Sequence, residues 1–297
     1  MSQKEMQEKN AIQGGTLYLV ATPIGNLSDL SERAVKVLGE VDFIAAEDTR
    51  NTGKLLSCLG ISRPMLSYHE HNKRERGGVI ADRLAAGESC ALVSDAGTPA
   101  VSDPGEDLVA LCAERGIPVT SIPGCCAAIT ALTLSGLSTT RFTFEGFLPV
   151  DRARRRERLS LLSSNLCTMI LYEAPHKLKS TLADLAGMLG EERRVALCRE
   201  LTKRNEEIMR TTLGEAIAYY AENDPRGEYV LILEGGHDQK PRDDAAADRA
   251  ALSPEAHVAY HENAGLSRMD AIKAAARERG MAKNQLYRLL CAQKDQK

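Results

Sequence analysis

The strongest constraint on the fold is an alternation of short apolar runs with amphipathic helical patterns, which begins near position 16. Four apolar runs in the first half predict buried strands, at 17–21, 42–47, 90–95 and 118–122. Three segments between them predict helices, at 31–38, 52–60 and 106–116. This order is typical of parallel β-α units with helices on both faces of a sheet, so we expect an α/β fold.

The second half repeats strands and helices in a different rhythm. Predicted strands lie at 167–172, 193–200, 208–213 and 229–235, and predicted helices follow position 151 and occupy 176–189 and 214–223. We therefore expect two dissimilar α/β lobes, with a boundary near 136–140. The expected organisation is a disordered leader (1–14), an N-terminal lobe (15–138), a C-terminal lobe (139–236), a polar linker (237–252) and a small helical, helix-turn-helix-like extension (253–297).

Composition excludes several classes of protein. The net charge of −3 excludes a globally basic nucleic-acid binder but permits local basic patches. The eight cysteines are scattered without a C-x-x-C pair, which indicates a reducing cytoplasm. His257 and His261 have H-x₃-H spacing but no cysteine pair to join them, so no structural zinc site is expected. The uncharged stretch 116–140 is long enough to span a bilayer, but its prolines and hydroxyl residues favour a buried strand, turn and helix.

Three loops that follow predicted strands have an unusual content of Gly and Pro: TPIGNL (22–27), SDAGTPAVSDPG (94–105) and IPGCC (122–126). Ligands of α/β sheets bind at the carboxyl ends of the strands, where Gly and Pro allow sharp turns and close approach. None of the loops has the G-x-G-x-x-G or P-loop spacing, which disfavours a dinucleotide or phosphate cradle of the usual kind. A small-molecule site is expected here, and a plain strand–helix turn is the alternative.

Two carboxylates in the second loop have alternative roles. Asp95 and Asp103 could hold a cation or a ribose diol, but no histidine lies near them in sequence, so metal is not expected. Asp103-Pro104 also fits ordinary helix capping, with Asp103 as N-cap and Pro104 as the first helical residue, and this is the favoured interpretation. In the third loop, Cys125 and Cys126 lack basic neighbours and are expected to act as small buried hydrophobes.

Acids and imidazoles follow two other strands. AEDTR supplies Glu47, Asp48 and Arg50, and SYHEH supplies His71. In a parallel sheet both loops lie at one edge, where an acid or imidazole could act as a general base and Arg50 could bind a phosphate or carboxylate. An exposed charged turn is the alternative for each residue.

Two segments carry local positive charge. The segment 151–158 (DRARRRER) has a net charge of +3, and the tail from 266 has a net charge of +5 in a helix–turn–helix pattern. Both suit a phosphate backbone, although a solvated helix face and a small packing module are the alternatives.

Six motifs in order carry a resemblance to a known family: TPIGNL, AEDTR, SDAGTPAVSDPG, IPG, YEAPHK and RELTK. They resemble the tetrapyrrole (corrin/porphyrin) methylase superfamily, and most closely its ribosomal RNA branch. The resemblance covers about 15–236 and implies two unlike α/β lobes that hold S-adenosyl-L-methionine between them, without metal. Thr98 stands where many relatives carry an acid, so Asp95 is the alternative source of that contact.

By position in these motifs, the resemblance implies cofactor contacts at Pro23, Gly25, Asp95, Gly97, Thr98, Pro99, Val101, Ser102, Cys126, Ala127, Tyr172 and Glu173. It implies 2′-O-methylation of a cytidine ribose in the decoding region of 16S ribosomal RNA, within the 30S subunit. Relatives dimerise, so a homodimer is expected, with no membrane association. Two other functions stay open: a tetrapyrrole C-methyltransferase, and a non-enzymatic nucleic-acid binder that senses a ligand.

Overall fold

The first sheet is parallel throughout and has the strand order β3-β2-β4-β1-β5. Its strands are β1 (Leu17–Val20), β2 (Phe43–Ala46), β3 (Met65–Ser67), β4 (Cys90–Val93) and β5 (Val119–Ile122). Helices α4 (Lys73–Ala85) and α5 (Glu106–Glu114) cover one face, and α2 (Glu32–Glu40) and α3 (Thr49–Cys58) cover the other. The parallel β-α units predicted for the first half are confirmed.

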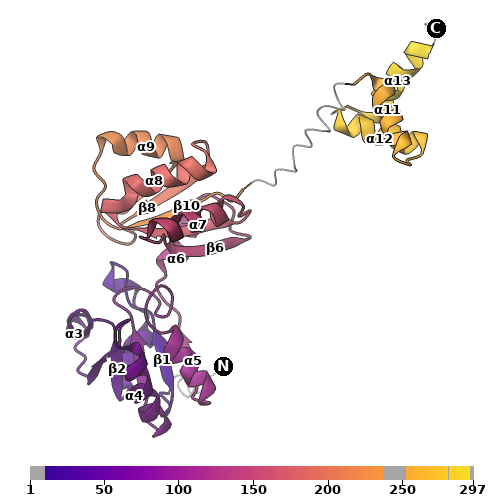
Figure 1. Cartoon of the computed structure of the whole chain (residues 1–297). Coiled ribbons are helices and arrows are strands. Elements are labelled where there is room, and N and C mark those ends of the chain that lie inside the picture. The colour runs from indigo at the N-terminus through magenta and orange to yellow at the C-terminus, as the bar shows by residue number, and fades with distance from the viewer. Residues whose placement is uncertain (1–10, 237–251, 280, 295–297) are drawn as a thin grey trace. The chain divides into compact units, whose positions relative to one another are not determined.

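This computed structural model describes residues 11–236, 252–279 and 281–294 (Figure 1). The chain divides into two compact units, 1–235 and 236–297. Positions 1–10 of the predicted leader and 237–251 of the predicted linker lie outside the described residues.

Burial on both faces explains why β1, β2 and β4 of the first sheet are apolar without interruption. In β1, Leu17 packs with α4 and α5, whereas Tyr18 and Val20 pack with α2 and α3. The alternation follows from the period-2 geometry of a strand, which sends successive side chains to opposite faces.

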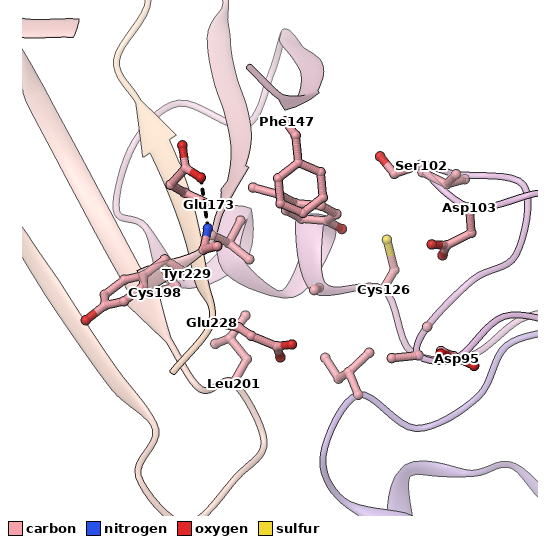
Figure 2. A pocket seen from close by; sticks show the side chains of 18 of the residues that line it. Asp95, Ser102, Asp103, Cys126, Phe147, Glu173, Cys198, Leu201, Glu228 and Tyr229 are labelled. Atoms are coloured by element: carbon pink, nitrogen blue, oxygen red, sulfur yellow. Dashed lines mark hydrogen bonds between the residues drawn. The ribbon is translucent and has the colours of Figure 1, made fainter. Parts of the chain in front are cut away.

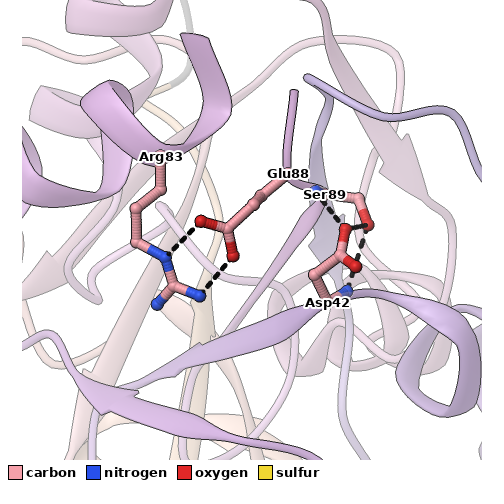
Figure 3. A network of polar contacts seen from close by, with 4 residues as sticks. All are labelled: Asp42, Arg83, Glu88 and Ser89. Carbon is pink, nitrogen blue, oxygen red and sulfur yellow. Dashed lines mark hydrogen bonds and ion pairs between the residues drawn. The ribbon is translucent and has the colours of Figure 1, made fainter. Parts of the chain in front are cut away.

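A polar network joins the amino-terminal ends of β2 and β4 (Figure 3). The Ser89 amide and hydroxyl each donate to Asp42 at 2.7 Å, and these bonds lower the pKa of the Asp42 carboxyl. Nearby, Arg83 makes a two-point ion pair with Glu88 and lies 3.5 Å over the Phe43 ring. These contacts fix the end of the sheet opposite to the Gly- and Pro-rich loops.

The second sheet has the order β6-β7-β10-β8-β9, in which only β6 and β7 pair in parallel. Its strands are β6 (Phe142–Phe147), β7 (Thr168–Glu173), β8 (Arg194–Arg199), β9 (Glu207–Thr212) and β10 (Tyr229–Leu233). Helices α7 (Arg152–Ser163), α8 (Pro175–Leu189) and α9 (Leu213–Glu222) cover one face. The two α/β lobes are therefore dissimilar, as expected, and the second is a mixed sheet.

The other face of the second sheet is covered by α6 (Ala127–Leu134), which directly follows β5 of the first sheet. Its residues Ala128, Ala131 and Leu132 pack against β7, β8 and β10. Helix α6 thus joins the two sheets, although it precedes the lobe boundary predicted at 138/139, which stays a prediction. The uncharged stretch 116–140 forms β5 and α6, and no described helix is long and apolar enough to cross a membrane.

The carboxyl-terminal unit contains α11 (Pro254–Asn263), α12 (Arg268–Glu278) and α13 (Lys283–Lys294). Ser253 and Ser267 cap the first two helices with their side-chain oxygens. A small core of Val258, Ile272, Ala275 and Leu286 holds the three helices together. The helical pattern predicted for the tail is present in its described part.

Candidate functional site

Hydrogen bonds join the three Gly- and Pro-rich loops at the carboxyl edge of the first sheet. Thr22 and Gly97 exchange backbone hydrogen bonds of 2.9 and 3.0 Å, which tie the loop after β1 to the loop after β4. The Thr98 hydroxyl donates to the carbonyl of Cys125 at 2.9 Å and ties in the loop after β5. Strand-end loops that were predicted to share an edge therefore form one continuous surface.

The loop after β1 also packs closely against the second lobe at Gly25. A Cβ atom at this position would lie 2.9 Å from Thr202 Oγ1 and still closer to the Lys203 side chain. Position 25 therefore has no room for a side chain. This close approach of the two lobes accounts for the glycine in TPIGNL.

A cavity of about 450 Å³ lies between the loops of the first sheet and the second sheet (Figure 2). Its size is within the usual range for small-ligand sites. Ten of the sequence-predicted site residues line it: Glu47, Asp95, Gly97, Thr98, Val101, Ser102, Cys126, Ala127, Tyr172 and Glu173. The lining does not include Pro23, Gly25, Pro99, Asp48, Arg50 or His71.

Three carboxylates from the first lobe face the cavity: Glu47, Asp95 and Asp103. The Asp95 amide donates to Glu47 at 3.2 Å, and Asn51 donates to the Asp95 carboxylate at 3.1 Å. Burial, together with the negative charges of Glu47 and Asp95, raises the pKa of Asp103 to about 6. Protonation of Asp103 therefore changes close to neutral pH.

The predicted capping role of Asp103 is wrong. Helix α5 begins at Glu106, its N-cap is Gly105, and no side chain caps it. Asp103 instead points into the cavity, on the side of Cys126 (Figure 2). Asp103 does not cap α5 because the chain turns at Gly105, two residues later, where φ is 153°.

Asp48, Arg50 and His71 lie outside the lining of the cavity. Asp48 is the N-cap of α3 and accepts bonds from the Arg50 amide and guanidinium, which lower its pKa to about 2. A carboxylate with so low a pKa is a weak base at neutral pH. His71 is exposed, and its ring contacts His69 edge-on at 5.9 Å. β2 and β3 are neighbours, so the two loops do share an edge as predicted.

The second lobe forms an aromatic wall and a buried carboxylate. Tyr172 lies edge-on to Phe147 at 5.6 Å, and Phe147 is 60% exposed at the cavity rim. Glu173 is buried and accepts bonds from the Ala174 amide at 2.9 Å and the Thr181 hydroxyl at 2.5 Å. Arg155 of α7 donates to that hydroxyl at 2.8 Å. Thr181 of α8 and Arg155 of α7 thus hold Glu173 in place.

Backbone strain is concentrated beside this cavity. Among the described residues, the non-glycine residues with positive φ are Ala100, Ser102, Glu200 and Thr202, with φ between 50° and 66°. Two lie in the loop after β4 and two in the loop after β8, and both loops line the cavity. Such conformations cost about 1–3 kcal/mol each, persist where the surrounding structure holds them, and cluster at active sites and ligand-binding loops.

Sequence reasoning missed several lining residues. Glu200 and Lys203 lie within the RELTK motif, so the motif carried the signal although no residue was singled out. Phe147 and Glu228 carried no pattern that could identify them. Of the described residues that line the cavity, six are acidic and one, Lys203, is basic. Lys203 is held between Glu200 and Glu228 at 2.8 Å from each.

Comparison with known proteins gives a consistent family. A family model described as Tetrapyrrole (Corrin/Porphyrin) Methylases matches residues 16–217. A protein from Synechocystis sp. named "Ribosomal RNA small subunit methyltransferase I" is 49% identical over 275 residues, 93% of this chain and 97% of its own. A Bacillus subtilis protein of the same name is 42% identical over 287 residues, 97% of this chain and 98% of its own.

Solved structures share the fold at low identity. A uroporphyrin-III-C-methyltransferase from Thermus thermophilus superposes with a TM-score of 0.54 at 20% identity, over 74% of this chain and 94% of its own. A cobalt precorrin-4 methyltransferase superposes with a TM-score of 0.56 at 18% identity, over 74% of this chain and 95% of its own.

Proposed function

This chain belongs to the tetrapyrrole (corrin/porphyrin) methylase family, and we propose that it transfers a methyl group from S-adenosyl-L-methionine to ribosomal RNA. The observation that carries the proposal is the match to relatives named as methyltransferases of the small ribosomal subunit RNA, over nearly the whole of both chains. The finer proposal is 2′-O-methylation of a cytidine in the decoding region of 16S ribosomal RNA, as the sequence motifs imply.

The charge of the cavity suits this donor. S-adenosylmethionine carries a sulfonium and an ammonium group, and it supplies an electrophilic methyl group when bound. Glu47, Asp95 and Asp103 present negative charge to such a cation. The small residues Gly97 and Ala127 leave room for a planar adenine beside the apolar wall of the second lobe. The predicted cofactor contacts at Pro23, Gly25 and Pro99 stay predictions, since these residues lie outside the lining.

Asp103 is the residue we propose as the general base. Its pKa of about 6 leaves it mostly ionised at neutral pH, yet more basic than an ordinary aspartate. Asp103 accepts the proton of the ribose hydroxyl as the new oxygen–carbon bond forms and the carbon–sulfur bond breaks. Because positive charge on sulfur disappears in this step, the chain needs chiefly to hold the reacting atoms in line.

The residues first considered for catalysis take other proposed roles. Glu47 fixes Asp95 through its amide and adds to the negative field around Asp103. Asp48 holds Arg50 at the start of α3, where the exposed guanidinium is available to a phosphate outside the cavity. His71, on the neighbouring exposed loop, is a candidate for the same outer contact.

An acidic cavity repels phosphate groups, so the RNA backbone would bind outside it. Arg152, Arg154 and Arg156 are exposed on α7, whereas Arg155 and Arg158 are engaged with Asp184 and Glu145. The exposed Phe147 at the rim offers a face on which an unstacked base could stack. The basic carboxyl-terminal helices add a second surface for phosphates.

The tetrapyrrole C-methyltransferase is the second candidate, because the two solved structures are named as methyltransferases of that class of substrate. Their identity of 18–20% is evidence for fold alone, and a small substrate needs neither the arginine-rich helix nor the basic tail. A non-enzymatic ligand sensor is disfavoured by the strained loops around the cavity.

A methylation assay with radiolabelled donor separates these functions. The substrates are isolated 30S subunits, naked 16S RNA and uroporphyrinogen, each offered to the full-length protein. We expect label in the RNA of the 30S subunit, on a cytidine ribose. Label on uroporphyrinogen, or on none of the three, would overturn the proposal. The homodimer, the cytoplasmic location and the lobe boundaries stay predictions.

A further inference from the structure

The carboxyl-terminal unit contains a cluster of metal-ligating side chains far in sequence from the cavity. His257 and His261 lie one turn apart on α11, and Glu278 lies at the end of α12. Their ligand atoms all lie within 4.8 Å of one another. His257 Nε2 is 2.9 Å from one carboxylate oxygen of Glu278, and His261 Nε2 is 3.4 Å from the other.

These distances suit one small cation. Zinc binds histidine nitrogen and carboxylate oxygen at about 2.0–2.2 Å, so two ligands of a tetrahedral zinc ion lie about 3.3–3.5 Å apart. The His261 distance of 3.4 Å matches that separation and the His257 distance of 2.9 Å is shorter, each measured to a different oxygen of Glu278. Side-chain rotations that bring the three ligand atoms from within 4.8 Å of one another to about 3.4 Å would place them around one metal, with the fourth position open to water.

Burial gives a second, independent indication. The side chain of His257 is fully buried, and that of His261 is 11% exposed. His261 Nε2 is buried and has no hydrogen-bond partner, although it points toward Glu278. A buried polar atom without a partner costs about 1–3 kcal/mol, and a metal ion at this position would satisfy it.

One neighbour opposes the metal. Arg279 Nη1 lies 3.3 Å from His257 Nδ1, and because arginine only donates, this nitrogen accepts and the ring proton is on Nε2. Metal at Nε2 would move that proton to Nδ1, so Arg279 would turn away and keep its bond to the Leu252 carbonyl. Arg279 should therefore weaken metal binding, both by this contact and by its charge.

We propose that His257, His261 and Glu278 form a binding site for a divalent transition metal of the zinc class, which fastens α11 to α12. A bound ion would link the first helix of the unit to the helix–turn–helix pair. The site is independent of the proposed methyl transfer, because its residues belong to the separate unit 236–297.

Cobalt(II) titration of the full-length, chelator-treated protein tests the proposal, because tetrahedral cobalt has intense visible bands. We expect one equivalent of Co²⁺ to give these bands and one equivalent of Zn²⁺ to remove them. His261→Ala and Glu278→Gln should each weaken binding by about tenfold or more, whereas His176→Ala, at an exposed histidine, should leave it unchanged. Arg279→Met should strengthen it.

The thiols need a separate control, since cysteine also binds these metals. In a Cys125→Ser/Cys126→Ser variant the visible bands should persist, without the near-ultraviolet absorption of a cobalt–thiolate bond. Circular dichroism checks that each variant is folded. Equal affinity in the wild type, His261→Ala and Glu278→Gln, or no tetrahedral spectrum, would overturn the proposal and leave a histidine–carboxylate contact of purely structural importance.

Discussion

Asparagine in place of Asp103 is the most direct test of the proposed chemistry. With a pKa of about 6, Asp103 is about one-tenth ionised at pH 5 and about nine-tenths ionised at pH 7. The rate of a single turnover on 30S subunits, at saturating donor, should therefore rise about tenfold between these pH values and then level off. Asp103→Asn should lower the rate at pH 7 by about 10²–10⁴ and abolish the inflection.

The stability of the folded protein should fall with rising pH, whereas the rate rises. Because the pKa of Asp103 is raised in the folded protein, ionisation costs free energy there, and the protein loses stability as pH rises from about 4 through about 6. Asp103→Asn removes this loss and should raise the melting temperature at pH 7. A catalytic group and a structural group are thus distinguished, because a structural loss would lower both activity and melting temperature.

Asp95→Asn is the matched control, since the charge of Asp95 helps to raise the pKa of Asp103. In that variant the inflection should persist and shift to lower pH. The reasoning would be refuted if Asp103→Asn kept a rate within about tenfold of wild type at pH 7. A wild-type rate that does not change between pH 5 and 7 would refute it equally.

Three further outcomes follow from the structure. Thr181→Val removes the donor to buried Glu173 and should lower the free energy of unfolding by about 1–3 kcal/mol in urea, against no change for exposed Ser180→Ala. Neutralising Arg152, Arg154 and Arg156 together should make the affinity for RNA less dependent on salt. The slope of log affinity against log salt should fall by about 0.7–0.9 for each phosphate that the protein no longer binds. An unchanged slope would exclude α7 from the RNA-binding surface. Removing residues 251–297 should weaken RNA binding and flatten its salt dependence while donor affinity, measured by calorimetry, stays the same; unchanged RNA binding would contradict a role of the tail.

The sequence was most informative where burial on both faces forces an unbroken apolar run, as in β1, β2 and β4. The loops after these strands could be assigned to one edge, because parallel strands end on the same side. Helix α4 was missed because it begins with a run of charged residues, KRER, followed by two glycines, which weakens the helical signal. The antiparallel pairing of β10 between β7 and β8 was missed because local patterns do not specify strand partners.

In the site, too, local sequence patterns do not reveal contacts with residues far away in the chain. Asp-Pro-Gly has the local features of a helix start, and only the tertiary structure shows that Asp103 is half-buried beside two other carboxylates. His257 and His261 stood out by their spacing, but their third partner lies in the next helix and no sequence spacing announces it. Charge and burial around a residue depend on segments far away in the chain, so pKa shifts and ligand sets are the properties least accessible from sequence.

Both lobes contribute residues to the cavity, and the strained residues lie in the loops of the two lobes that line it. The first lobe supplies three carboxylates, among them Asp103, and the second supplies three more together with the aromatic wall and Lys203. In-line transfer requires these two sets to be held in a fixed relation, because misplacement of the reacting atoms by about 1 Å can cost about 10² in rate. The strained residues lie in the loops that meet there, and rigid contacts hold them: the Thr22–Gly97 bonds in one loop, and in the other the Glu206 carboxylate, which accepts from the Thr202 amide at 2.7 Å. The strained backbone at Ser102 and Thr202 is therefore the cost of holding both loops in one fixed position. If the two loops were free to relax, the groups that they carry could move apart.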